Sequence, residues 1–309
     1  MIAPNFSDAC PTLSTPLSNK SVELPTDIVR EIFETTARNF PGTGAKLAGL
    51  CKRTQYWMEW IIYETVVLDH PSTRTSAFLC TIDARPAEFF YQRVKNLYLS
   101  YTLTLDEAQK ILSVCNGLTH LMCWAQSSQR PGWLLPLLSS PTLTRLSIKL
   151  DMLKTRGPLF SFSGKIFQGL THLEIVCPPP VNTGMSVDWT ALIELPKLKH
   201  FIIGNLFSRD HFYLLPIIRG LLDASASLGV LAILSKDPQM LEALDCQEFN
   251  DPRLVILPRF NWPLDLPTYW KNLYTGDLDA WEPSAQKGMK QRWERSQQMR
   301  RELVHYYLR

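Results

Sequence analysis

The frame "LTHLMC" (118–123) returns along this chain as "LTRLSI" (143–148) and "LTHLEI" (170–175). Three looser copies of the frame flank these: "VKNLYL" (94–99), "LKHFII" (198–203) and "LGVLAI" (228–233). The fourth positions of successive copies are separated by 24, 25, 27, 28 and 30 residues. Six short apolar segments at this period predict a repeated strand, turn and helix, and therefore a parallel sheet.

The chain on either side of the six frames extends the pattern. "PRLVILP" (252–258) predicts a strand after the last frame, and "ETVVL" (64–68) predicts one about a repeat before the first. Between frames the apolar period becomes helical: in "TLDEAQKILSVCNG", Thr104 and Glu107 have the spacing of a capping box, and Gly117 is expected to stop the helix. Further helices are expected to open on or near aspartate: after Val187, from Asp210 and from Asp237.

Side chains alternate between the two faces of a strand, which assigns each frame position to a face. If Leu121 and Cys123 point into the core, then His120, Met122 and Trp124 point to the opposite, inner face of the sheet. Aligned strands then place two columns of residues on that face. The first column is Asn96, His120, Arg145, His172, His200 and Val230, and the second is Tyr98, Met122, Ser147, Glu174, Ile202 and Ala232.

The residue types on this inner face allow three interpretations. A zinc site needs three or four converging ligands, but Arg145 interrupts the histidine column and no fourth ligand is evident, so no metal is expected. The polar side chains are either a solvated sheet face or a surface that binds a protein client, as concave repeat surfaces commonly do. The candidate client-binding residues are Tyr98, His120, Met122, Trp124, Arg145, His172, Glu174 and His200.

The chain before the frames predicts three short amphipathic helices. In "VELPTDIVREIFETTARN", Pro25 stands at the start of the first helix, where its missing N–H costs nothing. A second helix is expected after "FPGTG", with Leu47, Leu50 and Cys51 on one side, and a third over "QYWMEWIIYET". Such a unit is too small to bury much apolar surface, so we expect it to have low stability when isolated from the rest of the chain.

This segment resembles an F-box at "LPTDIVREIF" (24–33), "LAGLCKRT" (47–54) and "WIIYETVVL" (60–68). The resemblance implies docking on a Skp-type adaptor, which links such proteins to a cullin and a RING ubiquitin ligase. The adaptor-binding residues that carry over are Leu24, Pro25, Ile28, Ile32, Phe33, Leu50 and Cys51, with Trp57 and Trp60 as packing candidates. Thr54 stands where the family often has tryptophan, and the first loop, "ARNFPGTGAK", is long.

Residues 64–260 resemble leucine-rich repeat proteins, which implies a curved solenoid with a parallel inner sheet. The asparagine or cysteine that usually follows the strand in that family is mostly missing, so the solenoid is expected to be irregular. The order of parts is similar to that of F-box-like proteins of mushroom-forming fungi. The expected fold class is therefore α/β, and four parts are predicted: a disordered tail (1–22), an F-box-like helical domain (23–68), a leucine-rich-repeat-like solenoid (69–262), and a loop with a basic helix (263–309).

Composition limits the alternatives. With 45% hydrophobic and 20% charged residues among 309, the chain is long and apolar enough for a sizeable core. A formal net charge of +3 gives no reason to expect a nucleic-acid partner, and no apolar run is long enough to suggest a membrane segment. Seven scattered cysteines without a C-x-x-C pair favour reduced thiols, and hence a cytoplasmic or nuclear protein.

Together these features favour a non-enzymatic role. "GTGAKLAG" (42–49) lacks the spacing of a phosphate-binding loop, and no hydrolase or kinase motif is present, so no catalytic residue and no cofactor is expected. The expected function is that of a substrate receptor, which docks on a Skp-type adaptor and binds a protein client on the concave face. The alternative is an adaptor-independent scaffold in which the F-box-like helices only cap the solenoid.

Overall fold

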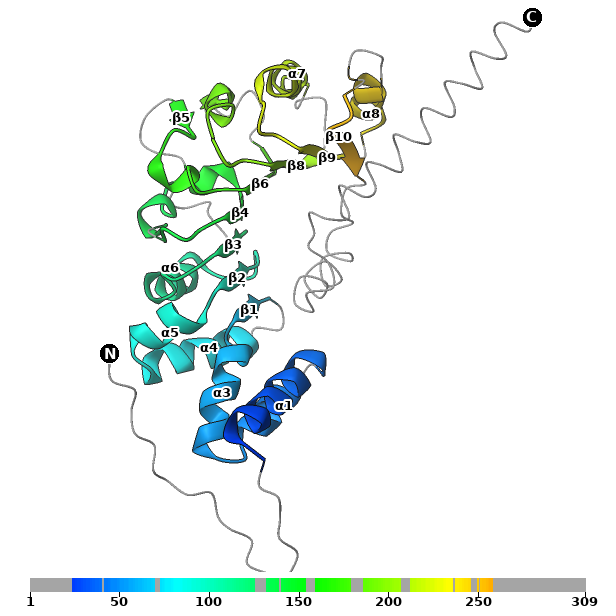
Figure 1. The fold of residues 1–309 in the computed structure, drawn as a ribbon. Helices are drawn as coiled ribbons and strands as arrows, with labels where there is room; N and C mark the ends of the chain where they lie inside the picture. The colour runs from blue at the N-terminus through cyan, green and yellow to red at the C-terminus, as the bar shows by residue number, and fades with distance from the viewer. Residues whose placement is uncertain are drawn as a thin grey trace, which may run out of the picture.

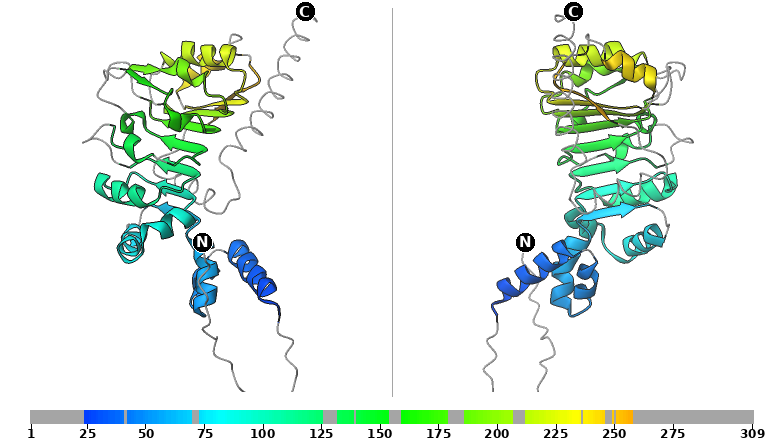
Figure 2. Two further views of the ribbon diagram at one scale, coloured as in Figure 1. Left: turned by 60° about the vertical axis from the view of Figure 1, so that its left-hand side comes forward. Right: turned by 90° about the vertical axis from the view of Figure 1, so that its right-hand side faces the viewer.

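The computed structural model describes residues 24–40, 42–69, 73–125, 132–138, 140–153, 159–178, 186–206, 212–235, 237–245, 249 and 251–257. Within them the chain is mixed α/β, with a curved eight-stranded parallel sheet and a small helical unit at its N-terminal end (Figures 1 and 2). The predicted segments 1–22 and 263–309 lie outside the described residues.

The strands of the sheet follow one another in chain order, β1-β2-β3-β4-β6-β8-β9-β10. Their bounds are β1 Thr65–Leu68, β2 Asn96–Leu99, β3 His120–Cys123, β4 Arg145–Ile148, β6 His172–Val176, β8 His200–Leu206, β9 Val230–Ser235 and β10 Leu254–Leu257. All eight predicted strands are confirmed. The register is confirmed as well, since His120 pairs with Arg145, Arg145 with His172, and His172 with His200.

The described helices that connect the strands lie on the outer face of the sheet (Figure 1). The helices are α4 Thr73–Ala84, α5 Ala87–Arg93, α6 Leu105–Val114, α7 Leu214–Ala224 and α8 Pro238–Asp245; single 3₁₀ turns are η1 Leu135–Leu137, η2 Leu150–Met152, η3 Lys165–Phe167 and η5 Trp189–Leu192. The predicted capping box of α6 is confirmed: the Glu107 backbone N–H donates to Thr104 Oγ1 and the Thr104 N–H donates to the Glu107 carboxylate. The two helices α4 and α5, inserted between β1 and β2, were not predicted.

The prediction of a helix after Val187 is wrong. Residues Ser186–Asp188 form strand β7, which pairs with β5 (Leu159–Ser161) in a separate two-stranded sheet, and only the short turn η5 follows. The Asp188 carboxylate accepts hydrogen bonds from Ser161 and Thr190, so this aspartate joins β7 to β5 without capping an α-helix. Asp210 lies outside the described residues, and α7 begins at Leu214.

The core lies between the sheet and its outer helices. The fourth frame positions are all at most 1% exposed, as expected: Leu97, Leu121, Leu146, Leu173, Phe201 and Leu231. They share one cluster with helix residues such as Phe90, Ile111 and Ile218. Burial of each such side chain contributes about 1.5–3 kcal/mol, so this continuous apolar layer stabilises the stacked units. Among the described helices, none is long and apolar enough to cross a membrane.

The thiols of Cys115 and Cys123 lie in this core. Burial raises the pKa of both thiols to about 12, whereas Cys80 on α4 is exposed. Because the thiolate is the reactive form, we expect a disulfide reagent at pH 8 to label Cys80 quickly and to label Cys115 and Cys123 only after unfolding. Mass spectrometry of native and denatured samples, which assigns the label to each cysteine, checks this order for these three thiols. Rapid native labelling of Cys123 would contradict the buried assignment.

The N-terminal unit consists of α1 Thr26–Asn39, α2 Thr43–Ala48 and α3 Lys52–Ile62. Trp57 and Met58 of α3 and Ala37 of α1 form its small core, and Phe33 packs against them. The middle helix is shorter than expected, so placing Leu50 and Cys51 on it was wrong: Leu50 lies in a turn, and Cys51 is the N-cap of α3.

Candidate protein-docking surfaces

Exposed apolar side chains concentrate in the N-terminal helical unit. Of the eight large hydrophobic residues that are exposed in the described part of the chain, six lie between residues 24 and 56: Leu24, Ile28, Ile32, Phe40, Leu50 and Tyr56. Leu24 is 54% exposed, Ile28 40%, Ile32 50% and Leu50 63%, and these four residues are called the docking face below. Apolar groups gathered on a surface commonly mark a contact with another macromolecule.

Helical periodicity explains why α1 has two different sides. Ile28 and Ile32 are four residues apart and lie on the same side of the helix. Phe33 and Ala37, also four apart, lie on the other side and pack on α3. Sequence reasoning grouped Phe33 with Ile28 and Ile32, but Phe33 belongs to the core of the unit. The α1 side that carries Ile28 and Ile32 remains exposed.

Thr54 has a structural role at the start of α3. Its hydroxyl accepts a hydrogen bond from the Cys51 backbone N–H at 3.1 Å, and the Cys51 Sγ lies 3.5 Å from the same oxygen. The bond from the Cys51 N–H is one half of a capping box, and the Thr54 backbone N–H directed at the Cys51 side chain is the other half; Thr54 is buried. The threonine therefore fixes the start of α3, and Cys51 lies partly buried beside it.

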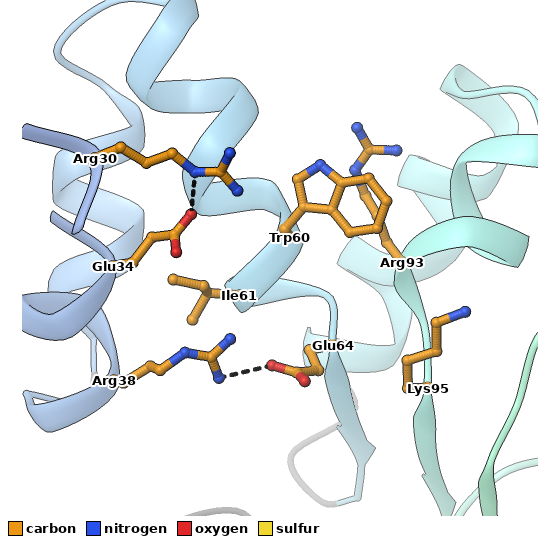
Figure 3. A pocket seen from close by; sticks show the side chains of 8 residues that line it. All are labelled: Arg30, Glu34, Arg38, Trp60, Ile61, Glu64, Arg93 and Lys95. Carbon is orange, nitrogen blue, oxygen red and sulfur yellow. Dashed lines mark hydrogen bonds and ion pairs between the residues drawn. The ribbon is translucent and has the colours of Figure 1, made fainter. Parts of the chain in front are cut away.

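Polar and cation–π contacts join the helical unit to the sheet around a cavity of about 280 Å³ (Figure 3). The Arg38 guanidinium of α1 donates to the Glu64 carboxylate, just before β1, at 2.9 Å. The guanidinium carbon of Arg93 in α5 lies 4.8 Å from the ring centroid of Trp60 on α3. Because Arg93 is buried, its cation–π contact is shielded from water, and we expect it to contribute more to the stability of the junction than the exposed ion pair of Arg38 and Glu64.

The first column of the inner face is half-buried and rich in imidazole and guanidinium groups. His120, Arg145, His172 and His200 follow one another across four adjacent strands. The rings of His172 and His200 are stacked, with centroids 4.3 Å apart and planes 27° apart. In the described part of the chain, no group of three or more His, Cys, Asp or Glu side chains is placed to hold a metal ion.

The second column differs from a solvated sheet face. Tyr98, Met122 and Glu174 of this column are all buried, none more than 7% exposed, and so is Trp124, which follows β3 on the same face. The Trp124 indole N–H donates to Ser147 Oγ at 2.9 Å, so the polar atoms of this face also bond within it. The interpretation of this column as open to solvent is therefore wrong, although the predicted direction of its side chains is confirmed by the register and by their separation from the outer core.

Sequence reasoning did not select Phe40 and Tyr56, which are 61% and 42% exposed. The exposure of Phe40 could have been predicted from the sequence, because an aromatic residue directly before proline in a loop has no helix face to pack on. The exposure of Tyr56 could not have been predicted in this way, because Tyr56 lies inside a helix next to Trp57, which is buried. No protein-family model matches this chain, and no curated protein matches it.

Proposed function

We propose that this chain is a substrate receptor of a Skp-cullin-F-box ubiquitin ligase. The helical unit at residues 24–62 acts as an F-box and docks on a Skp-type adaptor, and the curved sheet acts as an irregular leucine-rich-repeat solenoid that binds a protein client. The observation that carries the proposal is the docking face: Ile28 and Ile32 lie exposed on α1 although the helix has another side packed in the core.

The alternative of a cap without an adaptor has less support. A cap exists to cover the apolar end of a repeat array, so its apolar side chains should be buried against the first repeat. Here the core of the unit is its own, made by Ala37, Trp57 and Met58, and the exposed apolar residues remain in addition to it. Exposure on this scale favours a binding partner.

The links around the junction support a receptor mechanism. Two contacts connect α3 to the chain that leads into β2. The guanidinium carbon of Arg93 lies 4.8 Å from the ring centroid of Trp60 and 4.3 Å from that of Phe89. The Arg85 guanidinium forms an ion pair with the Glu59 carboxylate at 2.7 Å. A receptor of this kind needs no catalytic side chain. It raises the effective concentration of a client beside the loaded conjugating enzyme, and a fixed junction preserves the geometry on which that effect depends.

The test is binding of the purified full chain to a purified Skp-type adaptor, measured by size-exclusion chromatography and calorimetry. We expect a one-to-one complex, and a receptor in cells should shorten the lifetime of its client. A folded chain that binds no adaptor would refute the receptor function and leave the scaffold as the better explanation.

A further inference from the structure

Much of the inner face of the sheet is buried, from the second column onward, although the described helices cover the opposite face. Its side chains form two clusters, one around Tyr98, Met122, Trp124 and Val176 and one of Ile202, Ala232, Leu234 and Val255. All members come from strands or from residues directly after them, whereas the side chains of α4 to α8 that join a core lie in the outer core. Within the described ranges, then, no helix supplies a cover for this face (Figure 1).

Length and position favour the chain that follows β10. β10 is the last strand of the sheet in the described residues, and positions 258 to 309 of the sequence, 52 residues, come after it. Seven strand spacings of about 4.8 Å separate β1 from β10, roughly 34 Å in all. About ten extended residues span that distance, so the C-terminal segment reaches the whole inner face several times over.

Composition separates the two terminal segments. The six aromatic residues between 258 and 282 are Phe260, Trp262, Tyr269, Trp270, Tyr274 and Trp281. The N-terminal 23 residues contain a single aromatic residue, Phe6, and they join the helical unit at the other end of the sheet. Aromatic side chains are the best match for a face made by Tyr98, Met122 and Trp124.

Charge divides the C-terminal segment itself. Residues 258–282 carry four carboxylates, Asp265, Asp277, Asp279 and Glu282, against two cations, Arg259 and Lys271. Residues 283–309 are basic, with seven Lys or Arg against two Glu. The inner face presents Arg145 between His120 and His172, a column that attracts carboxylates and aromatic rings. The first part of the segment is therefore the complementary one.

We propose that residues 258–282 of the same chain lie across the inner face, with aromatic side chains on the Tyr98, Met122 and Trp124 cluster and carboxylates toward Arg145 and its neighbouring histidines. The regulatory consequence rests on the proposed function: the segment occupies the client surface, so a client must displace it. A tethered competitor acts at an effective concentration on the order of millimolar, which excludes weak, non-specific clients. The segment also indicates the chemistry of a client, an aromatic and acidic peptide stretch.

Site-specific photo-crosslinking of the full chain tests this placement. Tyr98 on the inner face is replaced by p-benzoyl-phenylalanine, and Tyr91, which is 47% exposed on α5, is the matched control. We expect at least ten times more intramolecular product from Tyr98 than from Tyr91, mapped by mass spectrometry to residues 258–282. Tyr101, half-buried beside the same cluster, is a second labelling position if the Tyr98 replacement perturbs folding.

Other products would overturn the proposal. Crosslinks to residues 1–23 or 283–309, crosslinks between isotopically distinct copies, or no crosslink at either inner position would each show that 258–282 is not the cover. Trp262→Ala with Trp270→Ala should reduce the product several-fold, while the matched Trp293→Ala variant should not. Adaptor binding of the same protein is measured separately, so failure of this placement is distinguishable from failure of the receptor function.

Discussion

The double variant Ile28→Asp with Ile32→Asp is expected to lose adaptor binding by at least about 100-fold, which corresponds to about 2.7 kcal/mol. Both side chains belong to the docking face, and apolar anchors at the centre of an interface commonly cost 2 kcal/mol or more when removed. A carboxylate in their place adds the cost of burying a charge without a partner.

The same change should leave the folded protein intact. Ile28 and Ile32 are 40% and 50% exposed, and surface substitutions of this kind usually change the free energy of unfolding by less than about 0.5 kcal/mol each. Ile28 lies in the first turn of α1, where the helix dipole favours a negative charge. Unchanged circular dichroism and melting temperature, with calorimetry of adaptor binding, are the measurements.

Two controls make the result specific. Leu159→Asp introduces a carboxylate at a leucine that is 53% exposed on β5, and it should bind the adaptor like the parent. Phe33→Asp places a charge against the core of the helical unit, so it should reduce both stability and binding. If the Ile28 and Ile32 variant binds as tightly as Leu159→Asp, the docking face is not the adaptor surface.

Gly117→Ala is expected to destabilise the protein by about 3 kcal/mol, because its new methyl group has no space. A Cβ at this position would lie 2.0 Å from the Tyr91 carbonyl oxygen, a backbone atom that a rotamer change cannot move. Lys95 Nζ also donates to the Tyr91 and Gly117 carbonyls, so the turn before β3 is held close to α5. The melting temperature should fall by roughly 5–10 °C.

Gly220→Ala is the matched control. Gly220 lies in α7, where a methyl group added to its Cα would meet no other atom within 4 Å, and alanine is favoured over glycine in a helix by about 1 kcal/mol. Thermal unfolding by circular dichroism should therefore show opposite shifts for the two glycines. Equal shifts would mean that the approach of Gly117 to Tyr91 is not a constraint on the fold.

Local pattern accounts for much of this architecture. The recurring frame placed six of the eight strands and their register, because the buried fourth position of each copy must align with the next for the core to be continuous. The apolar segments before and after the frames placed the other two strands. The spacing of Thr104 and Glu107, three positions apart, predicted the α6 capping box. The inserted helices α4 and α5 were not predicted. Helix α4 lacks a strong apolar pattern on one side, and α5 is only seven residues long.

The candidate surfaces depended on contacts between distant parts of the chain. The local pattern was enough to predict the order of the strands, the columns of the inner face and the helical spacing of Ile28, Ile32 and Phe33. The packing of Phe33 on α3, the exposure of Ile28 and Ile32, and the burial of Tyr98, Met122 and Glu174 became evident from the folded chain. Periodicity fixes the direction of a side chain, whereas its burial depends on which remote segment covers it.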